Sequence, residues 1–74
     1  MKGDKLYKLA LKMALKENAD LKEAFYNYMK SALSGYKQSI YEVGRLYYYG
    51  SGIIKDKQLA KVWLDVAAFY GIIA

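Results

Sequence analysis

Four lysines recur at three- and four-residue steps near the start of the chain: Lys5, Lys8, Lys12 and Lys16. On an α-helix this spacing places all four side chains on one face. A stripe of ammonium groups could attract an acidic protein or the phosphates of a nucleic acid. The same pattern is typical of a solvated helix face that only keeps a protein soluble, so both interpretations remain open.

The sequence contains no histidine and no cysteine. It therefore lacks the commonest general base, the usual transition-metal ligands and the thiolate nucleophile. Seven Asp and Glu residues are spread along the chain, and Asp20 and Asp56 are expected to cap helices rather than to form a catalytic pair. We therefore expect a chain that is not an enzyme, with no catalytic site, no metal site and no cofactor.

The segment Gly50-Ser51-Gly52 contains two glycines, a residue type that is also common in phosphate-binding loops. No strand is predicted before it, however, and no Lys-Ser or Lys-Thr pair follows at the spacing that such a loop requires. Glycines also permit the backbone angles of a tight turn. We expect this segment to join two antiparallel helices.

The two halves of the chain match at an offset of 36 residues. The paired positions are Asp20 with Asp56, Ala24 with Ala60, Tyr28 with Leu64, Ala32 with Ala68, and Gly35 with Gly71. A fixed period in the thirties, with small and aromatic residues in register, is typical of stacked helical hairpins. The sequence therefore predicts an all-α fold, a short α/α solenoid of two antiparallel helical hairpins.

Apolar periodicity and turn residues predict four helices, over residues 4–17, 21–34, 37–49 and 57–70. Asp4, Asp20 and Asp56 are the expected N-caps, and Gly35 is expected to follow the second helix in the left-handed conformation. Mid-helix Gly44 predicts a close helix crossing, because glycine there costs about 1 kcal/mol relative to alanine. Trp63 is expected in the core. We predict a single domain over residues 1–74, with a degenerate repeat at 1–35 and a well-matched repeat at 36–71.

The second repeat carries the residues of a named pattern. These are Tyr41-x-Val43-Gly44-x-Leu46-Tyr47, Gly50-x-Gly52-Ile53, Asp56, and Ala60-x-x-Trp63-x-x-x-Ala67-Ala68-x-x-Gly71. The pattern resembles the Sel-one-like repeat, a tetratricopeptide-related α/α solenoid; the match is poor over residues 4–19. Members of that family are adaptors and scaffolds without catalytic residues. The resemblance therefore implies a non-catalytic protein–protein interaction module.

In such repeats the first helices of successive hairpins line the concave surface. On the helix predicted over residues 37–49, the face left after the core positions are assigned carries the predicted partner-binding residues Ile40, Arg45, Tyr48 and Tyr49. Tyrosine and arginine are favoured at interfaces because they combine large contact area with a polar end. The alternative is that Tyr48 and Tyr49 pack on the glycine loop or against a missing neighbour.

The net charge of +5 favours an acidic protein partner. The alternative function is a small basic nucleic-acid-associated or regulatory protein, or an inhibitor, of bacterial or phage type. Eleven of the twelve basic residues are lysines, which lack the bidentate fork used in base and phosphate recognition, so nucleic acid is the second choice.

The apolar ends of the chain predict a fragment of a longer array, or ends that pair with another copy or with a target, since two hairpins are fewer than the roughly three that such arrays need. Of these, self-association or stabilisation by a bound target is favoured. No apolar run approaches the roughly 20 residues of a membrane span, and no signal peptide is evident. These features favour an intracellular location.

Overall fold

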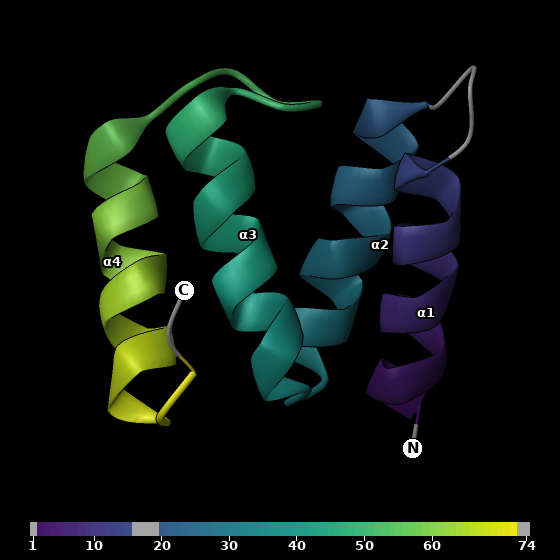
Figure 1. The fold of residues 1–74 in the computed structure, drawn as a ribbon, viewed down its shortest axis with the longest axis horizontal. Coiled ribbons are helices and arrows are strands. Elements are labelled where there is room, and N and C mark those ends of the chain that lie inside the picture. Colours follow the sequence, from purple (N-terminus) through teal and green to yellow (C-terminus); the bar gives the residue numbers. More distant parts are fainter. Residues whose placement is uncertain (1, 16–19, 73–74) are drawn as a thin grey trace.

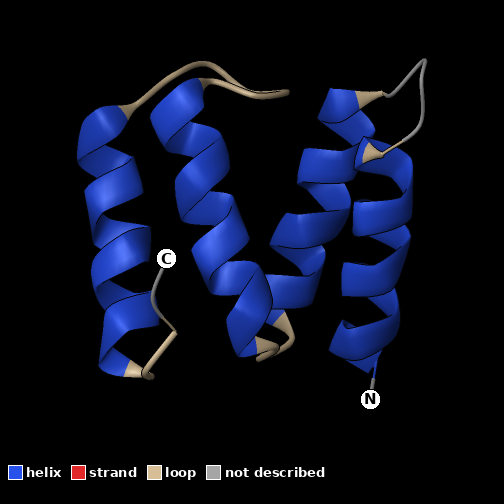
Figure 2. Cartoon of the chain, in the orientation of Figure 1, coloured by secondary structure: helices blue, strands red, loops and turns tan. Residues whose placement is uncertain are grey.

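The computed structural model describes residues 2–15 and 20–72, which form helices and turns (Figures 1 and 2). The helices are α1 (Lys2–Ala14), α2 (Leu21–Leu33), α3 (Lys37–Tyr49) and α4 (Lys57–Phe69). They follow one another across the molecule in chain order, and α1 with α2 and α3 with α4 form antiparallel hairpins (Figure 1). No strand occurs among the described residues, and the predicted all-α class is confirmed.

Two of the three predicted N-caps are confirmed. The Asp20 Oδ1 atom accepts a hydrogen bond of 3.0 Å from the Glu23 backbone N–H, and Asp56 Oδ1 accepts one of the same length from Leu59. Each bond satisfies one of the N–H groups that a helix leaves free at its start. The caps recur at the 36-residue offset seen in the sequence, so α2 and α4 begin in the same way.

The predicted cap at Asp4 is wrong. Helix α1 already begins at Lys2, which places Asp4 inside its first turn, where its carboxylate lies 3.7 Å from the Lys8 ammonium. The first turn of α1 is tied to α2, since the Ser31 hydroxyl donates a 2.6 Å hydrogen bond to the Gly3 carbonyl. The predicted end of this helix, at residues 16–17, lies outside the described residues.

Helices α2 and α4 also end alike. Gly35 and Gly71 adopt φ angles of 96° and 83°, the left-handed region that favours glycine. Their N–H groups donate to the carbonyls of Ala32 and Ala68, and the next residues, Tyr36 and Ile72, donate to Ser31 and Ala67. These paired bonds form a Schellman motif at each helix end. The left-handed conformation predicted for Gly35 is therefore confirmed, and the same turn recurs at Gly71, 36 residues later.

The core joins all four helices around small and aromatic side chains. Its members are Ala10 of α1, Phe25, Tyr28 and Ala32 of α2, Ile40 and Val43 of α3, and Ala67 of α4. The rings of Phe25 and Tyr47 meet edge to face at 5.3 Å, which connects α2 to α3. Trp63 is half-buried and packs against this core, as predicted.

A chain of buried hydroxyls links the first three helices. The Ser31 hydroxyl of α2 gives its hydrogen to the Gly3 carbonyl of α1, so the Ser39 hydroxyl of α3 is the donor in the 2.6 Å bond between the two serines. Both serine side chains are fully buried. Because each hydroxyl has a partner, the network orients α1, α2 and α3 without leaving a polar group unsatisfied.

Candidate functional site

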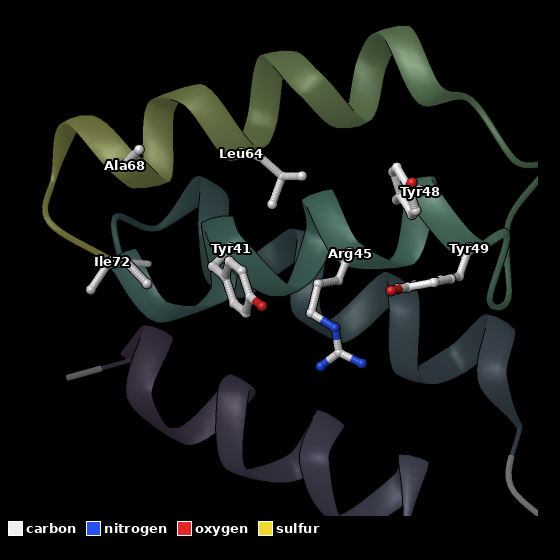
Figure 3. A pocket seen from close by; sticks show the side chains of 7 residues that line it. All are labelled: Tyr41, Arg45, Tyr48, Tyr49, Leu64, Ala68 and Ile72. Carbon is white, nitrogen blue, oxygen red and sulfur yellow. The ribbon is translucent and has the colours of Figure 1, made fainter. Parts of the chain in front are cut away.

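A pocket of about 370 Å³ opens between α3 and α4 (Figure 3). It is lined by Tyr41, Arg45, Tyr48 and Tyr49 of α3, by Leu64 and Ala68 of α4, and by Ile72 beyond α4. Helical geometry explains the α3 side, since Tyr41, Arg45 and Tyr48 follow one another at steps of four and three residues. The α4 side is apolar, so the pocket has an apolar wall facing a wall of tyrosine and arginine.

The two helices that form this pocket, α3 and α4, approach each other closely at Gly44. A Cβ atom added at Gly44 would lie 2.8 Å from the Leu64 Cγ atom and 3.2 Å from the Leu64 backbone nitrogen. These distances are shorter than ordinary van der Waals contact, so only glycine permits the observed approach. The close crossing predicted from Gly44 is confirmed.

Three of the four predicted partner-binding residues come together here. Arg45, Tyr48 and Tyr49 line the pocket, and Tyr48 and Tyr49 are 42 % and 64 % exposed. Their rings meet edge to face at 5.0 Å, so the two side chains pack partly on each other. The sequence signal that selected Arg45, Tyr48 and Tyr49 was their place on the helix face left after the core positions are assigned.

The fourth predicted residue, Ile40, was assigned to the wrong side of the helix. It is only 8 % exposed and belongs to the apolar core together with Val43, which lies three residues further along α3. Residues three apart share a helix face, so a buried Val43 also turns Ile40 toward the core. Tyr41, a position of the repeat pattern, is half-buried; it packs against the core and also lines the pocket.

Sequence reasoning also missed the α4 wall. Leu64 and Ala68 were recognised only as repeat positions, and Ile72 as part of an apolar end. The available signal was the 36-residue match of Leu64 to Tyr28 and of Ala68 to Ala32, because matched positions occupy the same face of their helices.

Two basic side chains lie on the tyrosine side of the pocket, Arg45 and Lys57. The Arg45 Nη1 atom donates a 3.2 Å hydrogen bond to Glu42 Oε1, and the arginine side chain remains half exposed. The Lys57 ammonium lies over the Tyr48 ring, 5.4 Å from its centroid. Cations over aromatic faces are stabilised by the ring quadrupole, which keeps this lysine beside the pocket.

The predicted basic stripe lies on a different helix. Lys5, Lys8 and Lys12 are exposed along α1, and Lys8 forms an ion pair with Asp4. Lys16, the fourth member, lies outside the described residues. A second hollow, of about 390 Å³, is lined by Leu6, Lys30, Leu33 and Ser34. None of the exposed stripe lysines contributes to either pocket lining.

Within residues 2–15 and 20–72, no group of three or more Asp or Glu side chains is arranged to hold a metal ion. None of the helices described has the length and hydrophobicity needed to cross a bilayer. Comparison of the chain with protein-family models, with curated proteins and with solved structures finds no match in any of the three.

Tyr28, at the junction of α1, α2 and α3, gives a prediction about pH. Burial first, and then the Glu42 carboxylate and Tyr7, raise the pKa of its phenol from 10.0 to about 12, and Arg45 opposes this shift. In the unfolded chain the same phenol loses its proton at an ordinary pKa, so its stabilising contribution is complete below pH 10 and is lost as the pH rises toward 12.

Tyr28→Phe removes this titration, so the variant's free energy of unfolding is expected to fall less steeply across that range. The slope should persist in part, because burial also raises the pKa of Tyr7. Urea unfolding at a series of alkaline pH values measures both slopes. Tyr26→Phe, which alters an exposed tyrosine on the same helix, is the control. Identical slopes for wild type and Tyr28→Phe would contradict the assignment.

Proposed function

We propose that this chain is a non-catalytic protein–protein interaction module that binds a partner through the α3 face of Arg45, Tyr48 and Tyr49. The observation that carries the proposal is that these three residues, selected from the sequence, line one pocket. Pockets with an apolar wall and a few polar groups are typical binding sites, since the apolar area supplies affinity and the polar groups supply orientation.

The chemistry of the pocket suits recognition of a protein. Tyr48 and Tyr49 offer large rings with hydroxyl ends, and truncation of such residues at the centre of an interface commonly costs about 2 kcal/mol. The Arg45 guanidinium keeps donors available beyond its single bond to Glu42. All three side chains project from a regular helix, which limits the ordering cost of binding.

Repetition supports the proposal that the module is of the Sel-one-like repeat type, with two hairpins in a short α/α solenoid. The caps at Asp20 and Asp56 and the turns at Gly35 and Gly71 recur at the same offset. Each helix packs chiefly against its neighbour in the sequence. Both features are typical of solenoids, in which each unit contacts only adjacent units.

The test is affinity capture from an extract of the source organism, with captured proteins identified by mass spectrometry. Tyr48→Ala and Tyr49→Ala are each expected to weaken binding of a captured partner by about 30-fold, the equivalent of about 2 kcal/mol. The control is Tyr26→Ala, since Tyr26 is also an exposed helical tyrosine with a lysine, Lys30, over its ring. Capture that survives both pocket substitutions would overturn the assignment.

A second candidate function follows from the exposed side chains of Lys5, Lys8 and Lys12 on one face of α1. A small basic nucleic-acid-associated protein would use this stripe, and its binding would weaken steeply as salt is raised. Nuclease treatment of the extract and substitution of the three lysines by glutamate separate the two functions. If nuclease treatment and the lysine substitutions abolish binding while Tyr49→Ala leaves it unchanged, the nucleic-acid function is favoured.

A further inference from the structure

The apolar wall of the pocket corresponds to a covered surface in the first hairpin. Leu64, Ala68 and Ile72 lie 36 residues after Tyr28, Ala32 and Tyr36. Since α2 and α4 begin with the same cap and end with the same turn, the two sets occupy the same face of their helices. The two hairpins therefore present the same face to whatever follows them.

In the first hairpin that face is covered by α3 and, at Tyr28, also by the Tyr7 ring of α1. Tyr28 and Ala32 are 3 % and 8 % exposed and share one apolar cluster with Ile40 and Val43 of α3. In the second hairpin Leu64 is only half-buried and Ala68 is exposed. The pocket therefore lies on α4 at the position that α3 occupies on α2.

We propose that this pocket binds a helix of another protein, which packs on α4 in the way that α3 packs on α2. The end of that helix nearest Lys57 and Lys61 carries carboxylates. This inference rests on the proposed function and specifies the partner. An amphipathic helix in a groove is a common mode of recognition, with anchors at steps of three and four residues.

The differences between α2 and α4 define the chemistry of the partner. Where α2 presents Phe25 to the Tyr47 ring, α4 presents Lys61, whose exposed ammonium lies 2.8 Å from the Asp65 carboxylate. Lys57 precedes Lys61 by one turn, so both cations flank the same end of the pocket. If the docked helix had an aromatic residue at the position equivalent to Tyr47, that ring would lie over Lys61. A carboxylate at the same position would instead complement the charge of Lys61.

The direction of the docked helix adds to this complementarity. Tyr47 belongs to the last turn of α3 and meets Phe25 near the start of α2. A helix placed in the same way on α4 brings its C-terminal end over Lys57 and Lys61. The free carbonyl groups there carry partial negative charge, which the two ammonium groups would stabilise.

A second copy of this chain is the less suitable occupant. In head-to-tail stacking, α1 of the second copy would take the position that follows α4. That helix exposes Lys5, Lys8 and Lys12, and each copy carries a net charge of +5. Like charges brought together at an interface oppose association, so charge favours an acidic helix from a different protein.

The test is selection from a phage-displayed library in which the exposed face of one helix in a rigid helical scaffold is randomised. Selection on the wild-type chain is expected to enrich apolar residues at the middle of that face and Asp or Glu near its C-terminal end. Ala68→Arg places a long charged side chain in the pocket and is expected to weaken the selected binders by at least about tenfold. Lys61→Glu is expected to shift the preference toward basic helices.

Val62→Arg is the matched control, because Val62 is exposed on the outer face of the same helix. Circular dichroism confirms that each variant remains helical. Recovery of no binder, enrichment of basic residues, or tolerance of Ala68→Arg would overturn the inference. So would a wild-type dimer in sedimentation equilibrium that dissociates on Ala68→Arg, since the occupant would then be a second copy.

The two proposals can fail separately. If a captured partner is lost on Tyr49→Ala but unaffected by Ala68→Arg and Lys61→Glu, the proposed function stands and the docked acidic helix is excluded. If the library yields acidic helices that depend on Ala68 while capture from the extract requires only the lysines of α1, the pocket binds helices but does not supply the natural function.

Discussion

Gly52→Ala is expected to lower the free energy of unfolding by about 3 kcal/mol, from backbone strain and steric overlap together. Gly52 has a φ angle of 76°, a conformation in which a side chain costs about 1–2 kcal/mol. In addition, a Cβ atom added there would overlap the carbonyl group of Leu21 at the start of α2. That neighbour is backbone, so relief requires the loop and the helix to separate.

Gly35→Ala and Gly71→Ala are matched controls. Both glycines have positive φ angles, 96° and 83°, but a Cβ atom added at either would meet no atom within 4 Å. Each control should therefore lose only the backbone component, about 1–2 kcal/mol. Urea unfolding followed by Trp63 fluorescence measures all three variants, with an osmolyte added if Gly52→Ala is unfolded in buffer. Equal losses at the three positions would show that the contact with Leu21 contributes nothing.

The contact at Gly52 matters for the architecture because it joins the two hairpins. The loop between α3 and α4 lies against the first residues of α2, next to the Asp20 cap. Together with the Phe25–Tyr47 ring contact, it fixes how α3 lies on α2. The helix proposed to dock on α4 would pack on it in the same way.

Local features of the fold were predictable from the sequence. The caps at Asp20 and Asp56 and the left-handed turn at Gly35 involve groups within a few residues of one another, so residue type and spacing suffice to predict them. The start of α1 was not predictable in this way. Its first turn is tied to α2 by the bond from Ser31 to the Gly3 carbonyl, whose partners are far apart in the chain.

The candidate site was predictable only in part. Arg45, Tyr48 and Tyr49 could be selected because they lie off the core positions of a regular helix. Ile40 was misplaced because family-pattern positions were given more weight than its three-residue spacing to Val43, which is fully buried. The opposite wall required tertiary information, since only the crossing at Gly44 brings Leu64 and Ala68 beside α3.

Gly44→Leu is expected to lower the free energy of unfolding by about 3 kcal/mol, the upper part of the range for overpacked sites. Helix propensity alone gives the opposite sign, because glycine in a helix interior is less favourable than alanine by about 0.8–1 kcal/mol and leucine ranks close to alanine. The loss is expected since the added Cβ atom would lie 2.8 Å from Leu64 Cγ and 3.2 Å from the Leu64 backbone nitrogen. The backbone contact means that α3 and α4 must move apart.

A double-mutant cycle with Leu64→Ala separates this contact from a general effect of the substitution. In the wild-type chain Leu64→Ala removes a half-buried side chain and is expected to destabilise the protein. In the Gly44→Leu background it makes room for the added side chain, so it is expected to stabilise the protein. Additive effects in urea unfolding would exclude a direct contact. Since Leu64 also lines the pocket, a coupled pair would show that the glycine of α3 sets the position of the pocket wall on α4, and hence the room available to a docked helix.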